Sequence, residues 1–149
     1  MVKKIIGKVK EQKGAALVEF AIVLPLILLL IFGMIEFSIL FYNQAVITNA
    51  SREGARFGIV YDYPTRPDVE EITKRALTYC EDRLITFGTP KLVANVKDDI
   101  ICSNPGDFLA VGVTYDYSFL VFPNLKGLFD NSPITGTITL QQETVMRCE

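Results

Sequence analysis

Histidine is absent from the 149-residue sequence, so the commonest metal ligand and general base of proteins is missing. The sequence also has no phosphate loop, no Gly-x-Ser-x-Gly elbow and no cysteine spacing typical of a zinc site. Asp98 and Asp99 could form a carboxylate pair, but adjacent aspartates near a strand end are more often solvated. We therefore expect no enzymatic activity, no metal, no cofactor and no small-molecule substrate.

The sequence has no cluster of basic residues outside its first fourteen positions. That leader carries one glutamate, Glu11, and five lysines: Lys3, Lys4, Lys8, Lys10 and Lys13. Removing this net charge of +4 from a chain of net charge −2 leaves −6 on residues 15–149. A nucleic-acid partner requires a basic face on the folded part, so we expect none.

Charge is nearly absent from Ala15 to Ile35, where Glu19 is the single ionisable residue. Twelve residues between Phe20 and Ile35 are Leu, Ile, Val or Phe, which favours membrane insertion by roughly 4 to 7 kcal/mol. The apolar run continues to Tyr42, too long for the core of a cleavable signal peptide. We predict a transmembrane helix over residues 15–42, which tolerates Pro25 near its end.

The five lysines precede the span and no comparable cluster follows it. The positive-inside rule then places the amino terminus in the cytoplasm. We expect a single-pass protein of the bacterial inner membrane, with the bulk of the chain outside.

Cysteine occurs three times, at Cys80, Cys102 and Cys148, in the part that we place in an oxidising compartment. One cysteine must stay unpaired. We predict a Cys80–Cys102 disulfide between the second helix and the sheet; the alternative is that these residues are small buried thiols.

Residues 43–58 keep helical periodicity without membrane hydrophobicity, so we predict an amphipathic continuation of the helix. The predicted buried face holds Ile39, Tyr42, Val46, Ala50, Gly54 and Phe57. Small residues at Ala50, Gly54 and Gly58 would allow close approach of a sheet or another helix. One helix from Ala15 to Phe57 would reach about 65 Å.

Residues 59–149 are predicted to form a small extracytoplasmic α+β domain. Asp68 and Glu71 form a capping box before a helix whose buried stripe is Ile72, Ala76, Leu77, Cys80 and Leu84. Three strands are expected, over residues 92–97, 109–119 and 134–147. The predicted fold is a long N-terminal helix packed on a three-stranded antiparallel sheet with one additional helix. Leu125, Leu128 and Phe129 form either an exposed patch for neighbouring subunits or local core.

The junction between leader and apolar run, Lys13-Gly14-Ala15-Ala16-Leu17-Val18-Glu19-Phe20, resembles the processing site of prepilins. In that family a basic leader ends in glycine, is cut on the cytoplasmic side, and is followed by glutamate at the fifth mature position. Counting from Ala15, Glu19 is fifth. Cutting after Gly14 would create an ammonium group that Glu19 of the same or a neighbouring chain neutralises. Alternatively, Glu19 reaches the cytoplasmic headgroups.

A longer pattern resembles the TadE-like family. It comprises the junction, Leu24-Pro25-Leu26, Gly33, Glu36, and Ala50-Ser51-Arg52-Glu53-Gly54-Ala55-Arg56. The resemblance covers residues 14 to about 58 and implies a minor pilin or pseudopilin of the tight-adherence machinery, which builds Flp pili for surface attachment and biofilm formation.

This resemblance implies a prepilin peptidase, other pilin-like subunits and the pilus assembly platform as partners, besides the lipid bilayer. It also implies assembly roles for Glu19, Phe20, Pro25, Arg52 and Arg56. The alternative is a membrane-anchored extracytoplasmic binding or sensor module, which would have no use for Gly14 and Glu19 in this arrangement.

Overall fold

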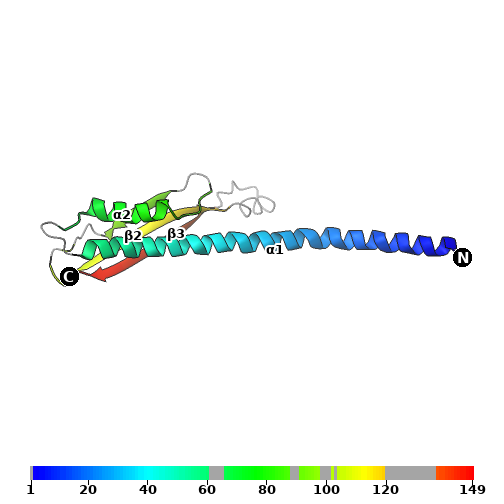
Figure 1. Ribbon diagram of the computed structural model, residues 1–149, viewed down its shortest axis with the longest axis horizontal. Coiled ribbons are helices and arrows are strands. Elements are labelled where there is room, and N and C mark those ends of the chain that lie inside the picture. Colours follow the sequence, from blue (N-terminus) through cyan, green and yellow to red (C-terminus); the bar gives the residue numbers. More distant parts are fainter. Residues whose placement is uncertain (1, 61–65, 88–90, 98–101, 103, 120–136) are drawn as a thin grey trace. The chain divides into compact units, whose positions relative to one another are not determined.

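The computed structural model describes residues 2–60, 66–87, 91–97, 102, 104–119 and 137–149, with only the backbone described for residues 2–13. The chain runs through α1 (Val2–Ile59), α2 (Val69–Glu81), β1 (Leu92–Val96), β2 (Phe108–Ser118) and β3 (Thr137–Arg147) (Figure 1). This order confirms the predicted α+β fold class.

Helix α1 begins at Val2, earlier than the predicted start at Ala15, and continues through Pro25 without ending. The lysines, glutamate and glutamine of the leader are good helix formers, so the helix extends back from the apolar run. The chain divides into two compact units, residues 1–36 and 37–149, and their boundary lies within α1.

Helix α2 has the predicted capping box. The Glu71 N–H donates to the Asp68 side chain at 2.7 Å, and the Asp68 N–H donates to the Glu71 carboxylate at 3.2 Å. Two amide groups of the first turn are thereby satisfied. The buried face of α2 consists of Ile72, Ala76 and Cys80.

The sheet is an antiparallel meander in the order β1-β2-β3, as predicted. In the central strand β2, alternate residues are buried: Leu109, Val111, Val113, Tyr115 and Tyr117. The opposite face carries exposed side chains, including Phe108 at 65% and Val145 at 57%. Among the described residues, one face of the sheet is therefore covered, and the other carries exposed side chains.

The C-terminal part of α1 and helix α2 together cover the buried face of the sheet. Val46, Ile47 and Ala50 of α1 pack in one cluster with residues of α2, β2 and β3, and Ala55 packs in a second cluster with Ile72 and Leu109. The predicted covering role of the amphipathic half of the long helix is confirmed.

Two glycines set the closeness of this packing. A Cβ atom at Gly58 would lie 2.5 Å from Leu109 Cδ2 and 2.7 Å from Ile72 Cδ1, and one at Gly54 would lie 3.2 Å from both Ala76 and Val111. The position of Gly58 beside Ile72 and of Gly54 beside Ala76 shows that α2 runs antiparallel to α1. The prediction that small residues permit close approach is correct.

The predicted buried face of α1 is partly wrong, because Tyr42 is 46% and Phe57 is 37% exposed. The buried stripe instead includes two polar residues, Asn43 and Ser51. Their hydrogen bonds compensate for burial: the Ser51 hydroxyl lies 2.7 Å from that of Thr144 on β3. The predicted stripe did not include Asn43 and Ser51, because their burial depends on partners outside α1.

Two groups of residues considered in the sequence lie outside the described part of the chain. They are the carboxylates Asp98 and Asp99 and the loop residues Leu125, Leu128 and Phe129.

Candidate functional site

The predicted processing site lies on an exposed stretch of α1. Gly14 and Ala15 are exposed, and no atom outside the local helix lies within 4 Å of the position that a Cβ would take at Gly14. Glu19 is also exposed and follows Ala15 by about one helical turn, roughly 6 Å along the axis. Phe20, the next residue, is 61% exposed. The junction is therefore helical, and the side chains that the structure describes there are exposed.

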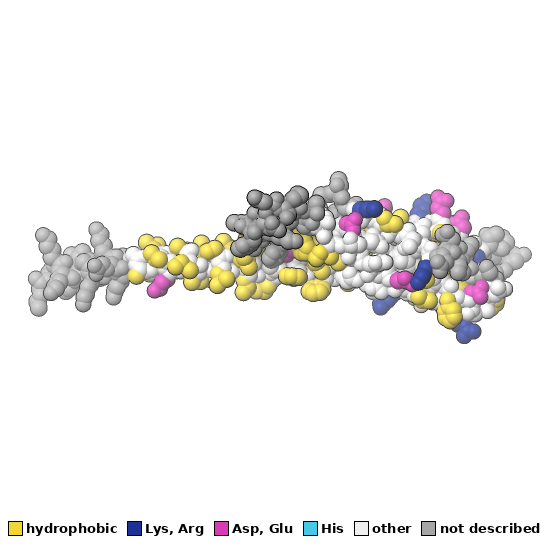
Figure 2. Space-filling model, turned by 180° about the vertical axis from the view of Figure 1, so that it is seen from behind, with side chains coloured by type: hydrophobic (Ala, Val, Ile, Leu, Met, Phe, Trp, Pro, Cys, Tyr) yellow, Lys and Arg dark blue, Asp and Glu magenta, His cyan; other side chains and the backbone are white. Residues whose placement is uncertain are grey.

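The apolar part of α1 presents its side chains outward. Among the described residues, the segment Gly14–Ile59 contains a stretch long and apolar enough to cross a membrane, with a mean hydropathy of 2.8 and none of it buried within the chain. Leu17, Ile22, Leu26 and Leu30 are each more than half exposed. On the face drawn in Figure 2, hydrophobic side chains cover this stretch. Such a surface requires a bilayer or other apolar helices around it.

The two arginines predicted to act in assembly differ in their surroundings. Arg56 donates to Glu53, one turn earlier, at 3.2 Å, and Arg75 of α2 donates to the same carboxylate at 3.0 Å. Arg52 is exposed and forms no ion pair with the described residues. Arg56 is thus engaged within its own chain, whereas Arg52 is available to a partner.

Glu53 joins the two helices. The hydrogen bond from Arg75 is the main reason why the pKa of Glu53 lies below its ordinary value; Arg56 adds to this, and partial burial opposes it. The Arg75 guanidinium also lies 5.9 Å from the centre of the Phe57 ring. Arg56 is a neighbour of Glu53 on α1, whereas the packing of α2 supplies its second arginine, Arg75.

Two hollows flank this contact on the surface of the folded unit. The larger, about 360 Å³, is lined by Glu53, Arg75, Thr78, Tyr79, Asp82 and Arg83. The smaller, about 160 Å³, is lined by Glu53, Arg56, Phe57, Val60, Pro67 and Arg75. Among the described residues, no group of three or more potential metal ligands lies together.

The predicted Cys80–Cys102 disulfide is wrong, because Cys102 pairs with Cys148 at a Cα–Cα distance of 5.7 Å. Antiparallel pairing of β3 with β2 returns the chain end to the residues that precede β2. There the Cys148 N–H donates to the Asp107 carbonyl at 2.8 Å, and the Gly106 N–H donates to the Cys148 carbonyl at 3.0 Å. Sheet register therefore brings the two cysteines together.

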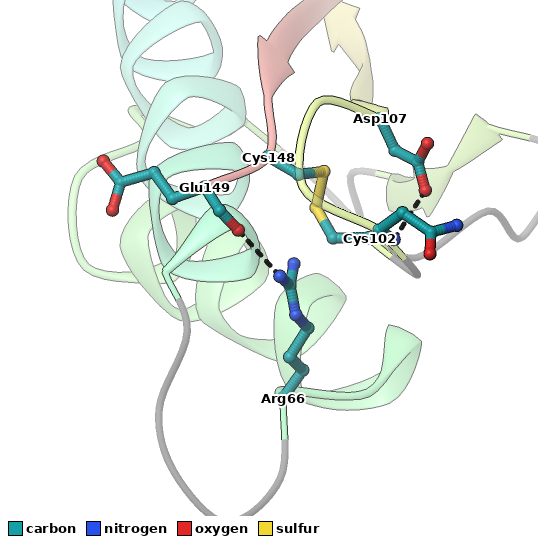
Figure 3. The surroundings of a disulfide bond; sticks show 6 residues. Arg66, Cys102, Asp107, Cys148 and Glu149 are labelled. Carbon is teal, nitrogen blue, oxygen red and sulfur yellow. Dashed lines mark hydrogen bonds between the residues drawn. A yellow bond between two sulfur atoms is a disulfide. The ribbon is translucent and has the colours of Figure 1, made fainter.

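The disulfide lies beside Arg66, which donates to the backbone carbonyl of Glu149 at 2.8 Å (Figure 3). The chain end is thus held both covalently and by a hydrogen bond. Cys80 is a free thiol, buried among the core residues of α2 and the sheet. Burial, with a smaller effect of Glu81, raises the pKa of Cys80 to about 11, which makes this thiol unreactive.

These features define an α+β protein with one apolar N-terminal helix suited to a membrane. The family model described as TadE-like protein matches residues 14–56, which confirms the TadE-like resemblance of this segment. No curated protein and no solved structure matches the chain. The matched segment includes the junction, the apolar helix and the Arg52–Arg56 stretch.

Proposed function

We propose that this protein is a minor pilin or pseudopilin of the tight-adherence pilus, cut after Gly14 by a prepilin peptidase. The observation that carries the proposal is the single carboxylate of Glu19, one turn after Ala15, on an exposed helix that is otherwise uncharged from Ala15 to Ile35. The family match over residues 14–56 supports it.

Cleavage gives this carboxylate a role. The new ammonium group of Ala15 and the carboxylate of Glu19 attract each other strongly where water is excluded. When apolar helices of neighbouring subunits pack together, pairing of one chain's amine with another's Glu19 allows both charges to be buried. Subunits that lack either charge are then disfavoured in the assembly.

The orientation of the chain follows from two independent features. The five lysines of the leader favour a cytoplasmic amino terminus. The Cys102–Cys148 disulfide supports a location of the folded unit on the oxidising side of the membrane. Both features support an inner-membrane protein whose folded unit lies outside.

Processing is tested by mass spectrometry of the amino terminus of the protein isolated from cells. Ala15 is the expected first residue. Gly14→Val should abolish cleavage without harming the fold, because the site of the new side chain is open. Gly7→Val is the matched control within the leader and should be cleaved normally. A parent chain that begins at Met1 contradicts the proposal and favours a plain membrane-anchored binding or sensor module.

Assembly is tested by copurification of the variant with the other pilus components after crosslinking in cells. Glu19→Gln should be inserted and cleaved but should copurify poorly, because the Ala15 ammonium has no partner. Glu70→Gln is the control, since Glu70 is an exposed carboxylate on α2. Equal recovery of Glu19→Gln and the parent would remove the charge-pairing mechanism.

The arginines provide a second test of assembly. Arg52→Gln should weaken copurification while leaving the folded unit as stable as the parent, because Arg52 forms no ion pair with the described residues. Arg56→Gln should have a smaller effect on copurification, since Arg56 already binds Glu53.

A further inference from the structure

Strand β3 lies at one edge of the sheet, and among the described residues no strand pairs with the side of β3 that faces away from β2 (Figure 1). We refer to this side as the β3 edge. The strand is 11 residues long, contains neither proline nor lysine, and pairs with β2 without a bulge. Proteins commonly use prolines, lysines and bulges to keep edge strands from pairing with other chains. The β3 edge has none of these and is suited to accept another strand.

The odd-numbered residues of β3 direct their peptide groups away from β2. The Cys148 N–H donates at 2.8 Å to the carbonyl of the residue before β2, so the antiparallel alternation turns the even-numbered residues toward β2. A side chain supports the same assignment, because the Gln142 amide donates at 3.0 Å to the Glu143 carbonyl. The outward N–H and C=O groups include those of Glu143, Val145 and Arg147.

These three residues also carry a side-chain pattern that is complementary to itself. Glu143, Val145 and Arg147 lie on one face of the sheet, since side chains alternate along a strand, and all three are exposed. If a second β3 runs antiparallel with Val145 opposite Val145, Glu143 of each copy lies opposite Arg147 of the other. Outward peptide groups then meet outward peptide groups. Two pairs of opposite charges flank an apolar contact in this arrangement.

Other registers of two β3 strands lack this complementarity. Glu143 opposite Glu143, or Arg147 opposite Arg147, brings like charges together at the centre. A register centred on Gln142 places Glu143 opposite the neutral Gln141. A shift by a single residue places the exposed face of one sheet beside the covered face of the other. The register centred on Val145 is therefore favoured.

We propose that the β3 edge binds the β3 edge of a second copy of this chain, in a two-fold contact centred on Val145. The contact is isologous, because each copy contributes the same surface. Hydrogen bonds between the two main chains join the sheets into one, and the alternate side chains set the register. The ion pair of Glu143 with Lys97, at 3.6 Å between largely exposed side chains, is weak and leaves Glu143 able to turn to its new partner.

The direction of β3 determines which chains this contact can join. β3 runs in the same direction as the last part of α1, because Val46 shares a core cluster with Leu140 and Ala55 shares one with Cys148. Antiparallel pairing of β3 therefore points the two folded units in opposite directions. Subunits packed side by side through parallel apolar helices point the same way, so the contact joins chains of two separate assemblies. It does not depend on the processing or the helix packing proposed above.

Crosslinking at position 145 tests the contact in the full-length protein. Val145→Cys is treated with a short bismaleimide in an excess of detergent micelles, so that two chains seldom share one micelle. Gln141→Cys is the matched control on the same edge, because its two copies would lie about 27 Å apart across the two-fold axis. Cys80 is buried and Cys102 is bonded to Cys148, so the introduced thiol is the one that reacts.

Charge changes in the Val145→Cys chain test the register. Glu143→Lys or Arg147→Glu alone brings like charges together at both ends of the contact, and each should lower the crosslinked fraction about tenfold. An equimolar mixture of the two variants should restore crosslinking, because each contact in a mixed pair again joins opposite charges. Near-UV circular dichroism equal to that of the parent shows that each variant is folded.

Crosslinking at Val145→Cys but not at Gln141→Cys, lost in each charge variant and restored by mixing, supports the proposal. Equal crosslinking at both positions, or a yield that the charge variants do not change, contradicts it. Absence of a crosslinked dimer of Val145→Cys also overturns it. A crosslink in cells to a different protein identifies another occupant of the β3 edge and excludes the second copy.

Discussion

Replacing Gly58 by alanine tests how closely α1 packs on the sheet. The added Cβ would lie 2.5 Å from Leu109 Cδ2 and 2.7 Å from Ile72 Cδ1, well inside van der Waals contact. Both neighbours are fully buried, so neither can turn into solvent. Overpacking of this kind costs about 1 to 3 kcal/mol, and alanine returns about 1 kcal/mol of helix propensity. The net expectation is a destabilisation of about 1 kcal/mol.

Gly54→Ala is the matched control on the same helix. Its Cβ would lie 3.2 Å from Ala76 and Val111, so a shift of a few tenths of an ångström accommodates it. The gain of about 1 kcal/mol in helix propensity then offsets the packing cost, and the stability should change little. The pair of variants separates helix propensity, which is the same at both sites, from packing, which differs.

Thermal unfolding of the full-length protein in detergent provides the measurement. The near-UV circular dichroism of Tyr115 and Tyr117, both buried, reports on the folded unit and not on the apolar helix. A loss of 1 kcal/mol lowers Tm by about 4 °C in a domain of this size. A Gly58→Ala protein with a Tm above that of the parent would refute the packing argument.

A double-mutant cycle identifies the atoms responsible. Ile72→Val removes Cδ1, and in the parent it should cost about 0.5 to 1.5 kcal/mol. In the Gly58→Ala background the same change also removes one of the two close contacts, so its cost should shrink or reverse. Strict additivity of the two substitutions would show that the Cβ of residue 58 does not press on Ile72.

Three further predictions concern single interactions. Cys148→Ser, or reduction of the Cys102–Cys148 disulfide, should lower the free energy of unfolding by about 2 to 4 kcal/mol, measured by denaturant unfolding with and without reductant. The buried thiol of Cys80 should not react with thiol reagents until the chain unfolds. Glu53→Gln should remove a stabilisation of about 0 to 1 kcal/mol, because the partners of Glu53 are largely exposed. The pKa of Glu53 is lowered in the folded state, so this stabilisation is present above its ordinary pKa of 4.5 and is lost as the pH falls through the folded-state pKa. Measuring the stability of the parent and of Glu53→Gln at a series of acidic pH values would detect this loss. Asn43→Ala should cost about 1 to 3 kcal/mol by leaving both peptide groups of Ile85 without their partner, and an unchanged Tm would contradict this.

Local signals along the sequence predicted most of the elements. The capping box at Asp68 and Glu71 fixed the start of α2, because its hydrogen bonds join residues only three apart. The strict alternation from Leu109 to Tyr117 predicted both the central strand and its buried face. The proposed processing site is likewise a contiguous stretch, so all of its residues can be found in the sequence alone.

Contacts between distant residues were predicted less well. The register of β3 against β2 decides which cysteine meets Cys102, and no spacing between cysteines contains that information. The same holds for Asn43, which was not among the residues predicted to be buried: its hydrogen-bond partner is an isoleucine 42 residues away.

The amino-acid sequence by itself determined that this chain has a basic first stretch, an apolar helix with one acid near its start, and a small α+β unit. These properties depend on composition and on short-range periodicity, which hydrophobic burial and helix geometry translate directly into structure. Only the tertiary structure decided the disulfide, the pairing of Glu53 with Arg75 and the burial of Asn43. Each of these depends on which surfaces meet when the helices cover the sheet, and that is settled by the packing of the whole folded unit.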